Sequence, residues 1–138
     1  MKKSVLVFAL FIFTVFNGTT QTTWEKLFGG VSYDIFRCVI EVPSGGYIAA
    51  GYISDNSAHD TDAYVVRLNT SGDTVWTFTY NGPMSKSDLF YKVINTIDGG
   101  FAICGYTTSV TGFSDDILLL KLNSSGQQQW VVHSWKIL

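Results

Sequence analysis

The sequence predicts an all-β fold built from two copies of one four-stranded unit. Three observations predict it. Residues 34–76 align with residues 88–130 without a gap, so that Trp76 and Trp130 occupy matched positions 54 residues apart. Short runs rich in branched and aromatic side chains alternate with clusters of Gly, Asn, Asp and Ser, which is the pattern of strands and turns. No segment places apolar residues every 3.6 positions, as an amphipathic helix would need.

The first two strands of each unit are joined by a glycine turn. In the first unit, residues 36–42 form the first run, and the turn at residues 43–46 (Pro-Ser-Gly-Gly) leads into a second run over residues 47–53. In the second unit the same turn contains Asp98-Gly99. This pair tolerates the positive φ of a tight turn, so each unit is expected to open with a hairpin.

The second half of each unit is expected to contain two more strands. A polar loop, residues 54–61, precedes the third strand, residues 63–68, which is mirrored by residues 117–122. The following turn, residues 69–72 (Asn-Thr-Ser-Gly), combines an Asn that can hydrogen-bond its own backbone with a Gly that adopts left-handed φ. This turn delivers the chain into the fourth strand, residues 74–80.

One further strand is expected before the first unit. Residues 24–30 align with residues 76–82, so residues 24–28 are predicted to be a lone copy of the fourth strand. After Trp130 the same opening breaks down, because residues 131–138 lack the glycine that should follow. We therefore treat residues 131–138 as a divergent tail.

Residues that recur in register are interpreted as structural. Asp62 and Asp116 stand where the third strand begins, and a turn-capping role is a simpler explanation than calcium binding together with Asp55, Asp60 and Asp115. The tryptophans recur once per repeat and are interpreted as packing between units, the alternative being a sugar-stacking platform. The structural repeat positions are Trp24, Gly45, Gly46, Asp62, Asn69, Gly72, Trp76, Gly99, Gly100, Asp116, Asn123, Gly126 and Trp130.

The units are expected to be blades of a propeller. Apolar side chains on consecutive residues, as at residues 117–120, suit strands that are covered on both faces. A four-stranded repeat of this length is typical of propellers, in which sheets pack face to face around an axis and about 4–8 blades close the ring. Two repeats therefore predict an incomplete, open β-propeller, either a fragment of a longer protein or a short chain that associates with copies of itself.

The repeated motifs resemble a known family. The pattern Trp-x-x-x-aromatic-x-Gly, Gly-Gly-aromatic, Gly-Tyr, Asp, Leu-Asn-x-Ser-Gly and Trp extends over residues 24–130. It is similar to the β-propeller repeats of large secreted bacterial proteins, including surface and gliding-associated proteins of Bacteroidetes-type bacteria. This resemblance implies extracellular scaffolds and binding surfaces, without specifying one activity.

The N-terminus has the pattern of a secretory signal. Lys2 and Lys3 precede an unbroken apolar run, residues 5–16, and small polar residues follow it. A spanning helix needs roughly 20 apolar residues, so this run is too short. We expect residues 1–20 to be a signal peptide and residues 21–138 to be secreted to the extracellular space or cell surface without membrane insertion. The alternatives are an uncleaved anchor and a periplasmic location.

The mature chain is expected to be mildly acidic. Removing Lys2 and Lys3 takes the formal charge from −2 to −4, and the remaining cations are scattered singly. Phosphate binding needs clustered cations, so nucleic acid is not expected as a partner, and an unidentified protein or glycan is. Cys38 and Cys104 do not occupy matched positions. Two small buried thiols are therefore favoured over a disulfide, although that alternative stays open.

No residue pattern indicates catalysis, a cofactor or a metal. His59 and His133 have no repeat counterparts and fit no metal or triad spacing. The paired glycines open no helix, as nucleotide motifs require. We therefore expect a non-catalytic scaffold or binding module without catalytic, cofactor-binding or metal-ligating residues. The alternative is the propeller portion of a secreted, carbohydrate-active enzyme whose catalytic residues lie outside this chain.

Overall fold

The computed structural model describes residues 23–30, 32–54, 61–82, 86–108 and 114–134. These residues form eight strands and contain no helix, and so no helix of the length and hydropathy that a membrane span needs. The predicted signal peptide, residues 1–20, lies outside the described residues, as do Asp55, His59 and Asp60.

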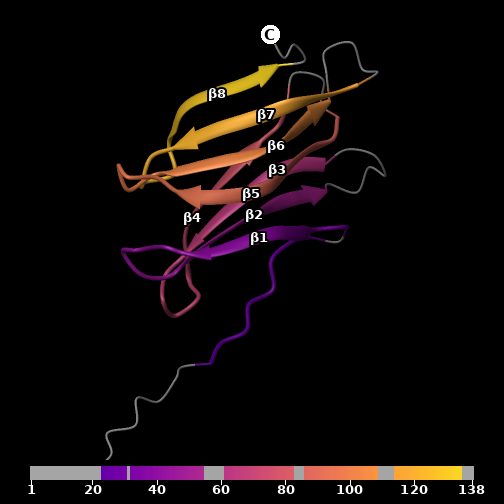
Figure 1. The fold of residues 1–138 in the computed structure, drawn as a ribbon. Coiled ribbons are helices and arrows are strands. Elements are labelled where there is room, and N and C mark those ends of the chain that lie inside the picture. Colours follow the sequence, from indigo (N-terminus) through magenta and orange to yellow (C-terminus); the bar gives the residue numbers. More distant parts are fainter. Residues whose placement is uncertain (1–22, 31, 55–60, 83–85, 109–113, 135–138) are drawn as a thin grey trace, which may run out of the picture.

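Two four-stranded antiparallel sheets make up the fold (Figure 1). Each sheet is open, with its strands hydrogen-bonded in chain order and its first and last strands at the edges. The predicted class, all-β with two open propeller-like blades, is confirmed. Sheet A contains β1 (Ile35–Glu41), β2 (Tyr47–Ser54), β3 (Thr61–Leu68) and β4 (Thr74–Tyr80), and sheet B contains β5 (Asp88–Asn95), β6 (Phe101–Thr108), β7 (Asp115–Leu122) and β8 (Gln128–Ser134).

The sequence repeat is reproduced in the irregularities of the two sheets. The register between the first two strands shifts between Phe36 and Cys38 in sheet A, and at the matched place between Phe90 and Lys92 in sheet B. A second matched pair of shifts lies at the end of β3 and of β7. Residues 131–134, expected in a divergent tail, continue β8 in the same way as β4 continues past Trp76.

The predicted lone strand at residues 24–28 is wrong. These residues form no strand and are attached to sheet A through side chains, with Trp24 and Phe28 packed against Val66 and Leu68. The physical reason is that a strand needs a backbone partner, and among the described residues this segment has none. We call residues 24–28 the N-terminal segment.

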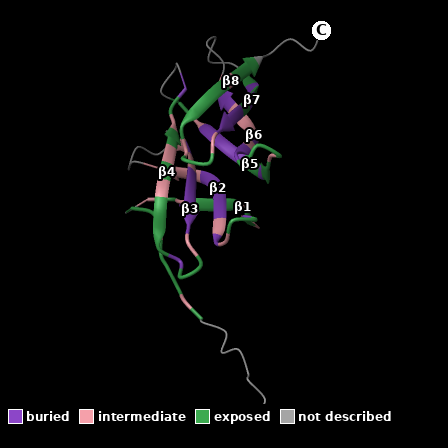
Figure 2. Cartoon of the chain, turned by 90° about the vertical axis from the view of Figure 1, so that its left-hand side faces the viewer, coloured by how far each residue is buried: buried purple, intermediate pink, exposed green. Residues whose placement is uncertain are grey.

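The main core lies between the two sheets. Sheet A contributes small side chains such as Ala50 and Val65, and sheet B contributes larger ones such as Phe90 and Leu120. Trp76 at the edge of sheet A packs against the same core. Figure 2 shows the buried residues concentrated on the inner strands, whereas β8 is mostly exposed, with Val131 packed against the core.

A buried basic residue is the last but one of the third strand of each unit and holds the first turn. Arg67 donates hydrogen bonds to the carbonyls of Gly45, Tyr47 and Leu68. The matched Lys121 donates to the Leu122 carbonyl at 3.1 Å, and its Nζ lies 2.9 Å from a carboxylate oxygen of Asp98. In both units the cation is therefore used inside the fold.

The next residue but one, an asparagine, closes the turn between the third and fourth strands. The Asn69 Oδ1 accepts hydrogen bonds from the backbone N–H groups of Ser71 and Asp73, at 2.9 and 2.8 Å. Asn123 does the same for Ser125 and Gln127, at 3.0 and 2.9 Å. Each asparagine thus replaces backbone hydrogen bonds that the turn leaves open.

The tryptophan of one unit docks on this turn of the next unit. The ring of Trp76 lies over Gly126, so that a Cβ at Gly126 would be 2.6 Å from the ring, and the indole N–H donates to the Ser124 carbonyl at 3.2 Å. Trp24 lies over Gly72 in the same manner, so that a Cβ at Gly72 would be 2.5 Å from its ring. The glycine is therefore required for close approach as well as for its positive φ.

This docking predicts unequal effects of two alanine substitutions. Gly126 and Gly99 have nearly the same φ, +79° and +78°, but a Cβ at Gly99 would meet no atom within 4 Å. Gly99→Ala should cost about 1–2 kcal/mol for the left-handed backbone alone. Gly126→Ala should cost a further ~1–3 kcal/mol, because the methyl group collides with Trp76.

Urea denaturation of both variants, alone and with Trp76→Ala, measures this difference. The excess cost of Gly126→Ala should vanish when Trp76 is absent. Equal costs for Gly99→Ala and Gly126→Ala in the wild-type background would show that the ring does not rest on this turn.

The Asp98 turn predicts an acid-dependent contribution to stability. Hydrogen bonds from the Thr96 hydroxyl, from Lys121 and from the Gly100 amide lower the pKa of Asp98 below its ordinary value. Because the folded state favours the carboxylate, this contribution is present above the unfolded pKa of about 3.9 and is lost as the pH falls through the folded value. The Tm difference between wild type and Asp98→Asn should therefore be largest above about pH 5 and shrink in stronger acid. A difference independent of pH would contradict this assignment.

Candidate binding surfaces

An apolar hollow lies on the face of sheet B that is turned away from sheet A. We call this the outer face of sheet B. Its groove has a volume of about 260 Å³ and lies over β5, β6, β7 and β8. The lining residues are Lys92, Ile94, Ala102, Ile103, Cys104, Leu119, Leu120 and Trp130.

Six of the eight lining residues correspond to residues of sheet A that belong to the core between the sheets. Ile94 matches Ile40, and Trp130 matches Trp76, both of which pack into the core between the sheets. Val65 is fully buried there, whereas its counterpart Leu119 is 42% exposed. The outer face of sheet B therefore has the composition of a packing surface without a neighbour on it.

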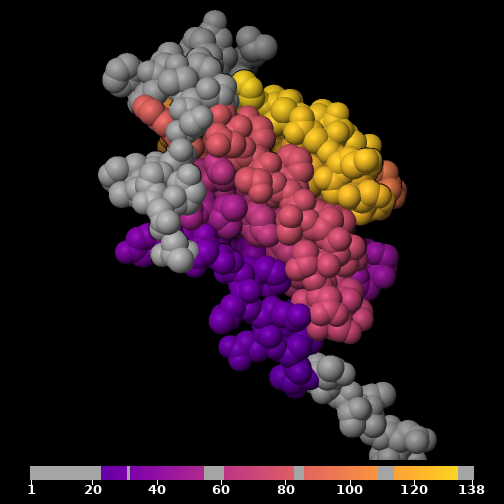
Figure 3. Space-filling model, turned by 180° about the vertical axis from the view of Figure 1, so that it is seen from behind, coloured from indigo at the N-terminus to yellow at the C-terminus, as the bar shows by residue number. Residues whose placement is uncertain are grey.

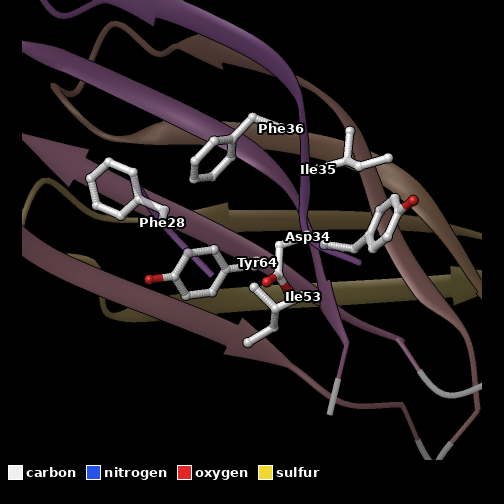
Figure 4. Close-up of a pocket in the computed structure, with 7 residues that line it drawn as sticks. Phe28, Asp34, Ile35, Phe36, Ile53 and Tyr64 are labelled. Carbon is white, nitrogen blue, oxygen red and sulfur yellow. The ribbon is translucent and has the colours of Figure 1, made fainter. Parts of the chain in front are cut away.

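The opposite end of the molecule has a smaller aromatic pocket. It lies on the face of sheet A that is turned away from sheet B, which we call the outer face of sheet A. Phe36 stacks with Tyr64 at 6.2 Å and meets Phe28 edge-on at 5.7 Å between ring centroids. Figure 4 shows these three rings grouped beside the carboxyl group of Asp34. The enclosed volume is about 20 Å³, enough for a water molecule and too small for an organic ligand.

Asp34 in this pocket has a structural role. Its carboxylate accepts hydrogen bonds from the backbone N–H groups of Gly30, at 2.6 Å, and Ser54, at 3.0 Å. Asp88 accepts the corresponding hydrogen bond from Gly82 in the second unit. Burial raises the pKa of the neighbouring Tyr64, so this phenol stays protonated at neutral pH. The hydrogen bonds to Asp34 and Asp88 therefore hold the chain where it enters each unit.

The residues considered for chemistry are not brought together. His133 is exposed on β8, and within the described residues no group of three or more His, Cys, Asp or Glu side chains could hold a metal ion. Asp116 is buried in β7, with its Oδ1 lacking a hydrogen-bond partner among the described residues. The turn-capping role expected of Asp62 and Asp116 stays a prediction.

The two cysteines are free and belong to different sheets, Cys38 to β1 of sheet A and Cys104 to β6 of sheet B. Cys38 projects from sheet A toward sheet B, and its thiol donates to the Val93 carbonyl at 3.9 Å. Cys104 lines the groove on the outer face. The two thiols are separate, as the favoured interpretation expects, but each is half-buried where that interpretation expects a buried one.

Sequence reasoning did not identify the groove. The consecutive apolar residues at 117–120 indicate strands covered on both faces, which is the signal that could have located it. Comparison of the chain with protein-family models finds no matching family, and comparison with curated proteins finds no matching protein. The resemblance to secreted bacterial propeller repeats therefore stays a prediction.

An apolar dye tests whether the groove is open in solution. Wild-type protein should enhance the fluorescence of 8-anilinonaphthalene-1-sulfonate, and Leu119→Lys should lose most of the enhancement because a charge enters the groove. Ile97→Lys is the matched control, since Ile97 is fully exposed in the turn between β5 and β6, away from the groove. Equal losses in the two variants would place the dye elsewhere.

Proposed function

We propose that this chain is a non-catalytic, secreted scaffold or binding module that engages a macromolecule through the outer face of sheet B. The observation that carries the proposal is the groove formed by Ile94, Leu119 and Trp130. Apolar and aromatic side chains bind by burial of surface and by dispersion, at about 25 cal/mol per Å² of apolar area. The groove residue whose charge could assist binding is Lys92.

The rigidity of the sheet supports a binding role. The groove side chains project from β5, β6, β7 and β8, whose ladders are continuous except for two register shifts. A partner would meet a surface that is already ordered, so little conformational entropy is lost on binding. Trp130 is nearly half exposed and offers an aromatic face that an apolar protein side chain or a sugar ring can cover.

The N-terminal sequence supports a place of action outside the cytoplasm. Lys2, Lys3 and the apolar run at residues 5–16 have the organisation of an export signal. The resemblance of the repeats to those of secreted bacterial scaffolds points to the same location. Export and binding together give the proposed role at the cell exterior.

Export is tested with a reporter. A fusion of residues 1–23 to a phosphatase that is active only after export should give phosphatase activity outside the bacterial cytoplasm. The exported fusion should also be cleaved near residue 20. Leu10→Arg should abolish both results, because a charge interrupts the apolar run. An unprocessed fusion retained in the cytoplasm would contradict the proposed location.

Binding is tested with immobilised extracellular polysaccharides and surface proteins. The purified chain should be retained by at least one of them, Leu119→Lys should reduce the retention about tenfold or more, and Ile97→Lys should not. The retained polysaccharide should show no new reducing ends. Hydrolysis of a bound polysaccharide by the purified chain would overturn the non-catalytic assignment.

A further inference from the structure

The packing between the two sheets shows what kind of surface covers an outer face like that of sheet B. Ala63 and Val65 of sheet A are fully buried against sheet B. Their counterparts Ile117 and Leu119 are 52% and 42% exposed. The same positions are therefore covered in one unit and open in the other. Ala63 and Val65 are covered by the face of sheet B that is turned toward sheet A. A surface with the side chains of that face would therefore also fit Ile117 and Leu119.

A surface of that composition exists on the outer face of sheet A. Val93 and Phe90 of sheet B are fully buried at the packing between the sheets. Their counterparts on sheet A, Val39 and Phe36, are 63% and 38% exposed. The chain thus carries both halves of its own internal packing surface, one at each end. Figure 3 shows these ends apart, with the N-terminal segment against the first unit and β8 at the other end.

We infer that the outer face of sheet B of one chain docks on the outer face of sheet A of a second copy, with the geometry by which sheet A packs on sheet B. The contact joins two different surfaces, so it is head-to-tail and can continue into longer assemblies or close a ring. This inference rests on the proposed function, because it names a second copy as a partner of the same groove.

The docked arrangement gives the exposed tryptophan a receiving site. Trp76 rests on Gly126 and beside Phe101, with 5.8 Å between ring centroids. By repeat correspondence, Trp130 of one copy would rest on Gly72 of the next, beside Tyr47. Both elements of the socket, a glycine of positive φ and an aromatic ring, are present at that place.

This socket is occupied by the chain's own N-terminal segment. Trp24 lies on Gly72 and 5.8 Å from Tyr47, which are the contacts that Trp130 of a second copy would make. The segment is not hydrogen-bonded into a sheet, and its ion pair, Lys26 with Asp73, is solvent-exposed. Residues 24–28 therefore occupy the place that the fourth strand of a second copy would take, and that strand can displace them.

Two hydrogen bonds between the sheets indicate which polar groups would meet in the docked pair. Between the sheets, the thiol of Cys38 donates to the carbonyl of Val93, and Asn95 Nδ2 donates to the Glu41 carbonyl at 2.9 Å. In the docked pair Lys92 takes the place of Cys38, and Glu41 of the second copy takes the place of Asn95. The Lys92 ammonium group can donate to the Val39 carbonyl of the second copy, whereas the Glu41 carboxylate has no N–H and does not reproduce the hydrogen bond of Asn95.

The oligomeric state of single and mixed variants tests the proposal. Sedimentation velocity of the purified protein should show association that rises with concentration. Val39→Lys blocks the outer face of sheet A, and Leu119→Lys blocks that of sheet B, so each variant alone should be monomeric. An equimolar mixture should form a one-to-one pair and nothing larger, because each variant keeps one intact face. Ile97→Lys should associate like wild type.

Folding of the variants is checked by circular dichroism, and Ile117→Lys provides a second substitution on the outer face of sheet B. A wild-type protein that stays monomeric to its solubility limit would overturn the proposal. So would a mixture of Val39→Lys and Leu119→Lys that stays monomeric. Association lost in Leu119→Lys but unchanged in Val39→Lys would also overturn it, because that result indicates a symmetric contact of two sheet B faces.

Competition by the N-terminal segment is tested with Trp24→Ala. Removing this side chain empties the socket, so association should occur at about tenfold lower concentration, equivalent to about 1.4 kcal/mol. Weaker association would show that Trp24 is part of the contact, and would overturn the inference that Trp130 of a second copy displaces it. These outcomes are separate from those of the proposed function, since dye binding and retention on immobilised partners are measured on monomeric protein.

Discussion

The contact of a tryptophan ring with the glycine turn of the following unit is the constraint on which the rest of the structure depends. The motif that contains it occurs twice, as residues 67–76 and 121–130, and each copy performs several tasks. The basic residue holds the first turn of its unit, and the asparagine closes the last turn. The glycine contacts a tryptophan ring, and the tryptophan at the end of the motif packs on the next unit. Spacing between units is therefore fixed by side-chain packing, which aligns the two sheets face to face.

Each unit both receives and supplies a tryptophan, so in two units one glycine turn receives no tryptophan from the other unit and one tryptophan has no turn to rest on. The socket at Gly72 is filled by Trp24 from the N-terminal segment. The tryptophan at the other end, Trp130, lies exposed beside an apolar groove. The proposed functions follow from this asymmetry: a face built for packing is available to a partner, and the chain carries a surface of the matching composition on its own first sheet.

Much of the fold could be predicted because its strands and turns follow local sequence patterns that occur in both repeats. The fourth strand has the predicted bounds, residues 74–80, since the Asn-Thr-Ser-Gly turn before it and the polar residues after it mark both ends. The third strand begins two residues earlier than predicted because Thr61 and Asp62 pair with the end of β2, a fact that depends on the neighbouring strand. Residues 24–28 have the sequence pattern of a strand but lack a backbone partner among the described residues. The presence of such a partner cannot be predicted from the local sequence. The groove was missed for the same reason: whether Leu119 is covered depends on what lies beside the sheet, not on its own sequence.

The most direct test of this account is the NMR spectrum of Gly126. With the Trp76 ring against its Cα, the Hα resonances of Gly126 should be shifted strongly upfield and show nuclear Overhauser effects to the indole protons, and Gly72 should show the same with Trp24. Gly99 has the same backbone φ without a ring above it and should have ordinary shifts. Ordinary shifts at Gly126 and no contact with the indole would contradict the claim that tryptophan docking sets the arrangement of the two units.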